Sequence, residues 1–185
     1  MTKATFLDLL RDTRGAAAAE MVLVLPLLLV IMFGSVELGN YMLDEHTLLR
    51  AVRDGARFAA RQPFSTYSGC NGTAANIPTP GTAGSPYENT KLIVQKGTLD
   101  STGSNLLPNW SDASTQFSVQ MTCSTTAGGV QMGGIYSGNT MGTANVAANV
   151  RVYARIKYRP LLGLFGFTGN GFYVDAADQA AVTGV

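Results

Sequence analysis

A carboxylate stands at the edge of a long apolar run near the beginning of this sequence. Glu20 precedes Met21–Phe33, in which every residue is apolar, and Gly15 lies five residues earlier at the end of a short charged segment. A charged side chain costs roughly 2.5–3.5 kcal/mol at the centre of a membrane helix and less near the interface, so Glu20 needs a cationic partner. Glycine lets another protein approach its backbone closely. The two residues therefore offer charge pairing and access to a peptide bond.

The chain after Pro63 offers little for catalysis. It contains no histidine, and its acids are widely spaced: Glu88, Asp100, Asp112, Asp175 and Asp178. A Ser/His/Asp triad cannot be built from these residues, and a pair of catalytic carboxylates is not indicated. His46 is the single histidine, and no other ligand type accompanies it, so we interpret it as a surface or packing residue. We expect no catalytic residue, no metal ion and no cofactor; an exported enzyme is the remote alternative.

Two cysteines, Cys70 and Cys123, lie in this later part, which is rich in Gly, Ser, Thr and Asn. Such a composition is typical of exported domains with short strands and polar loops. An isolated pair in that setting predicts one disulfide that closes a loop of about fifty residues. Two unpaired buried thiols are the alternative. Because neither a CxxC spacing nor histidine partners are present, we do not expect a zinc site.

The charges are balanced overall but unevenly placed. Thirteen Lys and Arg stand against twelve Asp and Glu, which gives no electrostatic case for nucleic-acid binding, and seven of the basic residues lie before Pro63, on both sides of the apolar run. From Ala16 to Phe33 the chain is apolar except for Glu20, a length near the lower limit for crossing a membrane. The preceding basic residues predict an N-terminus on the cytoplasmic side.

Two simpler interpretations of this segment compete. A secretory signal peptide would place its basic residues directly before the apolar core and a small-residue cleavage site after it. Here four alanines and a glutamate intervene, and no good A-x-A site follows. A simple membrane anchor accounts for the apolar length but explains neither Glu20 nor Gly15.

The helix is predicted to continue beyond the apolar run until Pro63 ends it. Unbroken from Ala16 to Gln62, it would be on the order of 70 Å long, with residues 16–39 in the membrane and 40–62 projecting from it. Beyond Phe33, apolar residues recur every three or four positions: Leu38, Met42, Leu49, Val52, Ala56 and Ala59. The opposite face is polar: Asn40, Asp44, Thr47, Arg50, Asp54, Arg57 and Arg61.

The remaining chain predicts a small antiparallel sheet after a long loop over residues 63–90. Alternating apolar and polar residues indicate strands at Gln116–Cys123, Asn145–Tyr158 and Gly171–Val182, and a short one at Lys91–Gln95. The apolar face of the sheet and the apolar stripe of the helix must each be buried against another element. The expected fold class is α+β, with a long N-terminal transmembrane and amphipathic helix packed against the sheet.

The motifs can now be taken together. They are R-G-x4-E from Arg14 to Glu20, LPLLL around Pro26, Phe33-Gly34 followed by Glu37-Leu38-Gly39, RAVRDGARFAA over 50–60, and Tyr158-Arg159-Pro160-Leu161-Leu162. The N-terminal motifs cover about fifty contiguous residues and are fairly specific; the remainder matches only loosely. In this order they resemble the TadE-like pseudopilins of the tight-adherence (Flp) type IV pilus.

The resemblance implies that a prepilin peptidase cuts the chain between Gly15 and Ala16. The chain would then divide into a cytoplasmic leader at 1–15, the helix at 16–62 and an exported, disulfide-closed domain at 63–185. Cleavage would leave an ammonium group on Ala16, and Glu20 one turn later could neutralise it in the same or a neighbouring chain. A glutamate that merely reaches the aqueous interface is the alternative. Glu37 is either a solvated charge or a packing contact between subunits.

The resemblance also implies a location and a set of partners. The chain would sit in the bacterial inner membrane with its C-terminal domain in the periplasm, and in an extracellular pilus after assembly. Its partners would be the peptidase, other pilin subunits, the membrane platform with its ATPase, and lipid around the helix. As a minor pilin it would join, initiate or tip a filament for surface attachment. The alternative is an uncleaved, single-pass tether that carries a periplasmic binding or adhesion domain.

Overall fold

The computed structural model describes most of the chain from the first helix onward. The described residues are 14–67, 75–76, 83–124, 126–127, 130–131, 134–136, 140–141, 144–145, 147–165 and 171–184. The predicted leader before Arg14 and the predicted disulfide partner Cys70 lie outside them. The domain boundaries therefore stay a prediction.

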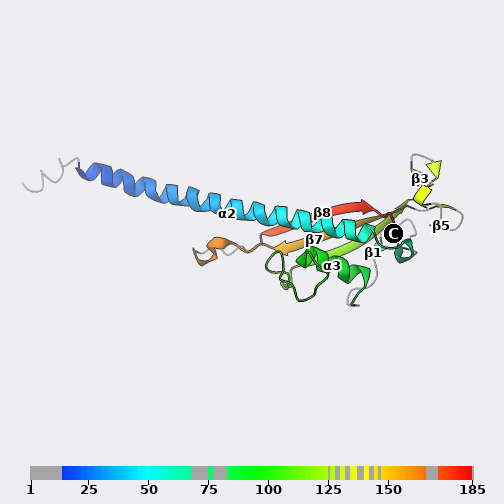
Figure 1. Cartoon of the computed structure of the whole chain (residues 1–185). Coiled ribbons are helices and arrows are strands. Elements are labelled where there is room, and N and C mark those ends of the chain that lie inside the picture. Colours follow the sequence, from blue (N-terminus) through cyan, green and yellow to red (C-terminus); the bar gives the residue numbers. More distant parts are fainter. Residues whose placement is uncertain are drawn as a thin grey trace, which may run out of the picture.

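One long helix organises the molecule. Helix α2 runs unbroken through Pro26 from Arg14 to Ala60, 47 residues or roughly 70 Å, as the sequence predicted. Its N-terminal half projects away from the rest of the chain, whereas its C-terminal half lies along the sheet (Figure 1). None of the most apolar 18-residue window is buried, and the helix is long and apolar enough to cross a membrane. These properties fit a single-pass membrane protein.

The distal domain contains a four-stranded antiparallel sheet in the order β1-β2-β7-β8. Its strands are β1 (Ala75–Asn76), β2 (Gln116–Ser124), β7 (Ala147–Lys157) and β8 (Tyr173–Ala181). The central strand β7 places Val152 opposite Val119 on β2 and opposite Asp178 on β8. The three long strands confirm the predicted ones to within a few residues, and the α+β fold class is confirmed.

Short elements join these strands at the periphery. Two small ladders pair β3 (Thr126–Ala127) with β4 (Val130–Gln131) and β5 (Thr140–Met141) with β6 (Ala144–Asn145). Three 3-10 turns are η1 (Phe64–Tyr67), η2 (Gly134–Tyr136) and η3 (Leu161–Phe165). Both ladders lie at the end of the sheet away from the projecting half of α2 (Figure 1).

The prediction of a loop up to residue 90 and a strand at Lys91–Gln95 was wrong. Residues Pro86–Lys96 form a second helix, α3. Ser85 caps it by accepting a hydrogen bond from the Glu88 amide at 3.2 Å, and Gly97 ends it with a left-handed backbone (φ 74°). Ser85, Pro86 and Glu88 are the start signals of a helix, and they outweigh the short apolar run that suggested a strand.

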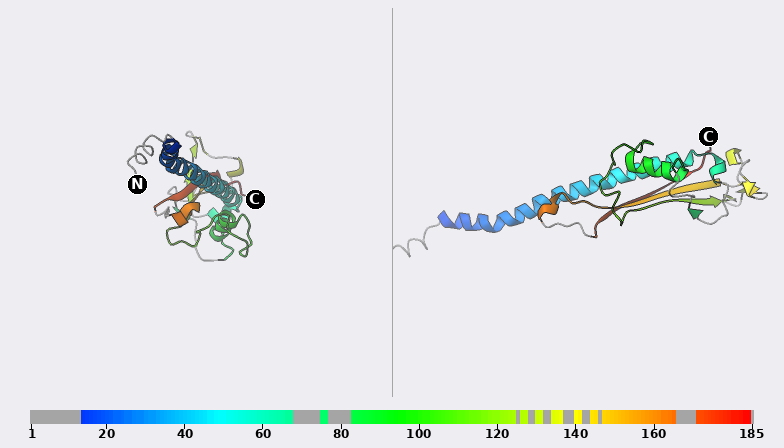
Figure 2. Two further views of the ribbon diagram at one scale, coloured as in Figure 1. Left: turned by 90° about the vertical axis from the view of Figure 1, so that its left-hand side faces the viewer. Right: turned by 90° about the horizontal axis from the view of Figure 1, so that it is seen from below.

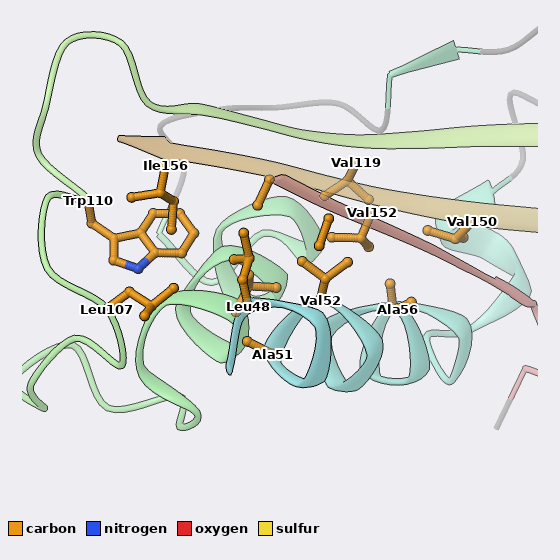
Figure 3. Close-up of a cluster of buried hydrophobic side chains, with 14 of the residues drawn as sticks. Leu48, Ala51, Val52, Ala56, Leu107, Trp110, Val119, Val150, Val152 and Ile156 are labelled. Atoms are coloured by element: carbon orange, nitrogen blue, oxygen red, sulfur yellow. The ribbon is translucent and has the colours of Figure 1, made fainter. Parts of the chain in front are cut away.

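Helices α2 and α3 and the sheet enclose one hydrophobic core. Leu48 and Val52 of α2 point toward Val119 and Val152 of the sheet (Figure 3), and all four side chains are almost completely buried. In the left view of Figure 2, which looks along the molecule from the N-terminal end of α2, most of the domain lies to one side of this helix. Trp110 is also buried and meets Phe117 edge-on, with ring centroids 6.5 Å apart, as expected for a core residue.

The predicted apolar stripe of α2 was right at its distal end and wrong near the membrane. Val52, Ala56 and Ala59 are buried as expected, whereas Leu38 and Met42 are more than half exposed. The face toward the domain instead passes through Glu37, Asn40, Tyr41 and Asp44, which are half-buried. Close to a bilayer, apolar residues can face lipid, so hydrophobic periodicity there does not identify the face that contacts protein.

Candidate functional site at the junction of helix and sheet

The predicted processing seam lies in the first turn of α2. The Gly15–Ala16 bond falls just after the helix begins at Arg14, and Glu20 follows one turn later with an exposed side chain. Residues four apart lie on the same face of a helix, so the spacing of Ala16 and Glu20 suits an ion pair once Ala16 becomes a chain end. In the uncut chain Glu20 forms no ion pair within the described residues. Cleavage and pairing remain predictions.

A second acidic residue of α2, Glu37, accepts hydrogen bonds from three groups of the chain that follows β7. Its Oε1 accepts a hydrogen bond from the Tyr158 hydroxyl at 2.6 Å and one from the Leu161 amide at 3.3 Å. Its Oε2 accepts one from the Leu162 amide at 3.2 Å. The first residues of η3 have amides without partners inside that turn, and the carboxylate satisfies two of them. Glu37 therefore attaches the chain beyond β7 to the end of the apolar half of α2.

Three tyrosines, Tyr41, Tyr158 and Tyr173, contribute contacts beside Glu37. Asn40 donates a hydrogen bond to the Tyr158 oxygen at 2.9 Å, and the Tyr41 hydroxyl donates to the Tyr173 carbonyl at 3.2 Å. The rings of Tyr41 and Tyr158 meet edge-on with centroids 5.2 Å apart. Burial raises the pKa of Tyr158 to about 12, and its hydrogen bond to Glu37 adds to the increase. Tyr158 is thus a neutral donor at physiological pH.

This junction answers the question that the sequence left open about Glu37. In the single chain the residue is neither a freely solvated charge nor available only to another subunit; it fixes the distal domain to α2. The sequence motifs contained both halves, Glu37-Leu38-Gly39 and Tyr158-Arg159-Pro160-Leu161-Leu162, but nothing in their spacing shows that residues 121 positions apart meet. We call the cluster of Glu37, Asn40, Tyr41, Tyr158 and Tyr173 the junction.

Glu37→Gln and Tyr158→Phe are each expected to destabilise the distal domain by about 1–2 kcal/mol, since each removes a hydrogen bond to a charged group. The double variant should lose less than the sum, with a coupling energy on the order of 1 kcal/mol. Urea unfolding of the full chain in detergent micelles can be followed through Trp110, the single tryptophan. Additive effects would contradict the contact.

Tyr153→Phe is the matched control for the junction variants. Tyr153 is half-buried on β7, the strand that precedes Tyr158, and its hydroxyl forms no hydrogen bond to another described residue, so the stability of the Tyr153→Phe chain should change little. The raised pKa of Tyr158 supplies a second measurement, the dependence of stability on pH. Tyr158 stabilises the folded state fully below the unfolded pKa of about 10, and this contribution is lost as the pH rises toward about 12. Stability should therefore fall more steeply above pH 10 in the parent chain than in Tyr158→Phe.

The predicted disulfide partners can be placed only in part. Cys123 is half-buried on β2, opposite Ala148 of β7, and packs against the core. Cys70 lies outside the described residues. We expect the purified chain to resist alkylation in denaturant until it is reduced, and Cys123→Ser to lower stability by roughly 2–4 kcal/mol under oxidising conditions. Full alkylation of both thiols in denaturant without reductant, measured by intact mass, would instead support the alternative of two buried thiols.

The described acids of the distal domain make structural contacts and are not brought together as a catalytic pair. Asp112 accepts hydrogen bonds from the Ser114 hydroxyl and, at 2.8 Å, from the Ser114 amide, and Asp100 accepts one from the Thr102 amide at 2.8 Å; these bonds lower the pKa of both carboxyls. Asp178 forms an ion pair with Arg53 of α2 at 3.6 Å. His46 is exposed on α2, and the described residues contain no group of three metal-ligating side chains.

Comparison with known proteins bears on the N-terminal helix. Residues 15–57 match the family model described as TadE-like protein. No curated protein and no solved structure matches the chain. The matched segment runs from the predicted processing seam to Arg57 and includes Glu20, Glu37 and most of α2. The resemblance to the TadE-like family is thereby confirmed over residues 15–57.

Proposed function

We propose that this chain is a minor pilin of a tight-adherence pilus, a filament component rather than an enzyme. The observation that supports this most directly is the TadE-like match over residues 15–57, which begins at the glycine of the processing seam. The TadE-like family is pilus-associated and structural in kind. The exposed apolar half of α2 and the domain fixed to its other half suit a subunit whose helix packs among other helices.

In this proposal the helix first serves as a membrane anchor and then as a packing element. The N-terminus lies in the cytoplasm, a prepilin peptidase cuts between Gly15 and Ala16, and the distal domain is exported. The new ammonium group on Ala16 pairs with Glu20 of its own or an adjacent subunit. That pairing removes the electrostatic cost of a carboxylate at the membrane edge as the helix leaves lipid for the filament. The membrane platform and its ATPase drive assembly.

A second function remains compatible with the same features. An uncleaved chain would be a single-pass tether that presents the distal domain in the periplasm for binding or adhesion. The polar composition after Pro63 favours neither function over the other. The two functions differ in the N-terminus of the mature molecule and in the response to removal of the peptidase.

N-terminal sequencing and intact mass of the chain purified from membranes test the proposal. We expect a mature chain that begins at Ala16, because the peptidase needs the open backbone at Gly15. Gly15→Val should leave the leader attached, whereas Gly34→Val, a glycine of the same helix with nothing within 4 Å of its Cβ position, should be processed normally. A native chain that begins at Met1 in cells with active peptidase would favour the tether.

A further inference from the structure

The end of the distal domain nearest the apolar half of α2 exposes two large hydrophobic side chains. Leu161 is 59% exposed and Phe172 is 65% exposed. Both flank Tyr158: the Phe172 carbonyl accepts a hydrogen bond from the Tyr158 amide at 3.0 Å, and Leu161 follows two residues after Arg159. η3, drawn in orange, is the part of the domain that extends furthest along α2 toward its blue end (Figure 2). These side chains therefore lie on the membrane-facing end of the domain.

The position of the junction along α2 determines how deep Leu161 and Phe172 would lie relative to a bilayer. The uninterrupted apolar run ends at Phe33, and Glu37 lies four residues later, about 6 Å further along the helix. The headgroup layer on each side of a bilayer is roughly 5–8 Å thick. If α2 spans the membrane, Glu37 lies within that layer, and Leu161 is hydrogen-bonded to Glu37. Leu161 is thus held at the boundary between headgroups and acyl chains.

The chemistry of this end suits a lipid surface. Leu161 and Phe172 are apolar and more than half exposed, and Arg159 beside them is exposed and cationic. Apolar side chains at this depth enter the acyl boundary while an arginine remains near the phosphates. Among the described residues of the domain, the other exposed large hydrophobic side chains are Leu99 and Leu106, which follow α3 and lie outside the junction.

We propose that Leu161 and Phe172 insert into the interfacial layer of the bilayer beside α2, as a second, non-spanning membrane contact. The occupant of this apolar surface is lipid, because the surface is continuous with the membrane half of the helix and is held at headgroup depth by Glu37. The contact goes beyond the proposed filament function and requires only that α2 spans the bilayer. Two attachment points fix the orientation of the distal domain on the membrane.

Depth-dependent quenching in the full chain tests this contact. Leu161→Trp and Phe172→Trp are compared with Leu99→Trp, which is similarly exposed (52%) in the same domain, and with Val24→Trp in the apolar half of α2. Each chain is reconstituted into phosphatidylcholine and phosphatidylglycerol vesicles that contain no bromine, lipids brominated near the headgroup, or lipids brominated near the ends of the acyl chains. Trp110 contributes the same background in every variant and is subtracted by using the parent chain.

We expect at least threefold more quenching for Leu161→Trp and Phe172→Trp than for Leu99→Trp, together with a blue-shifted emission. Strong quenching of Val24→Trp by the lipids brominated near the chain ends establishes that the helix is inserted. With that control positive, quenching of Leu161→Trp no greater than that of Leu99→Trp would overturn the proposal. A blue shift that depends on the protein-to-lipid ratio and resists bromine would also overturn it, since a second copy of the chain would then cover the surface.

Discussion

Glu20→Gln is expected to leave cleavage between Gly15 and Ala16 largely intact and to reduce incorporation of the chain into filaments about 30-fold. The substitution keeps the shape of the side chain but removes its charge, so the ammonium group of Ala16 would enter the packed helices without a counter-ion. Leaving this charge without a counter-ion at the membrane edge costs about 2 kcal/mol, which corresponds to that factor. The exposed side chain of Glu20 has no ion pair among the described residues, so its loss should not disturb the domain.

The measurement is the ratio of chain in sheared filaments to chain in membranes, by quantitative immunoblotting of cells that express each variant. Glu45→Gln removes one negative charge from the half of α2 that lies along the sheet and is the matched control. It should be incorporated as the parent chain is. Normal incorporation of Glu20→Gln would exclude charge pairing as the function of Glu20. Retention of the leader in this variant would show that Glu20 acts in processing instead.

The sequence was most informative where a periodic pattern had one physical cause. β7 alternates because one face covers the core, and its inward residues Val150, Val152 and Ala154 are completely buried. The length of α2 followed from an apolar run and an amphipathic run with no helix-ending signal between them. On the predicted polar face of α2, Asp54 and Arg57 form an ion pair at 3.9 Å one turn apart. Each of these features depends on near neighbours in the sequence.

The junction could not be predicted because its parts are distant in sequence and its chemistry is ambiguous. Glu37 follows an apolar run, where either a solvated or a buried carboxylate is possible. Only the antiparallel β7–β8 pair, which ends at Lys157 and Tyr173, brings Tyr158 to the level of Glu37. The same ambiguity explains the misplaced apolar stripe near Leu38, because an apolar residue there can face either lipid or protein. α3 was missed for a different reason, since its cap residues were present but were assigned to a loop.

Gly55→Ala is expected to destabilise the distal domain by about 1–3 kcal/mol, because α3 crosses α2 at this glycine without room for a side chain. A Cβ atom there would lie 2.3 Å from Val94 Cγ2, far inside the usual 3.5–4.0 Å contact. Val94 is fully buried and β-branched, so it cannot rotate away and the whole of α3 must move. Urea unfolding followed through Trp110 measures the loss. Gly39→Ala, with nothing within 4 Å, should keep or raise the midpoint.

A double variant separates the steric cause from a loss of helix geometry. Val94→Ala alone should destabilise by about 1–3 kcal/mol because it leaves a cavity in the core. Combined with Gly55→Ala it vacates the space that the new methyl group needs, so the double variant should be at least 1 kcal/mol more stable than the sum of the single effects predicts. Strict additivity would mean that α3 does not press on Gly55. The glycine in the RAVRDGARFAA motif would then have no packing role, and its place within the TadE-like segment would require another explanation.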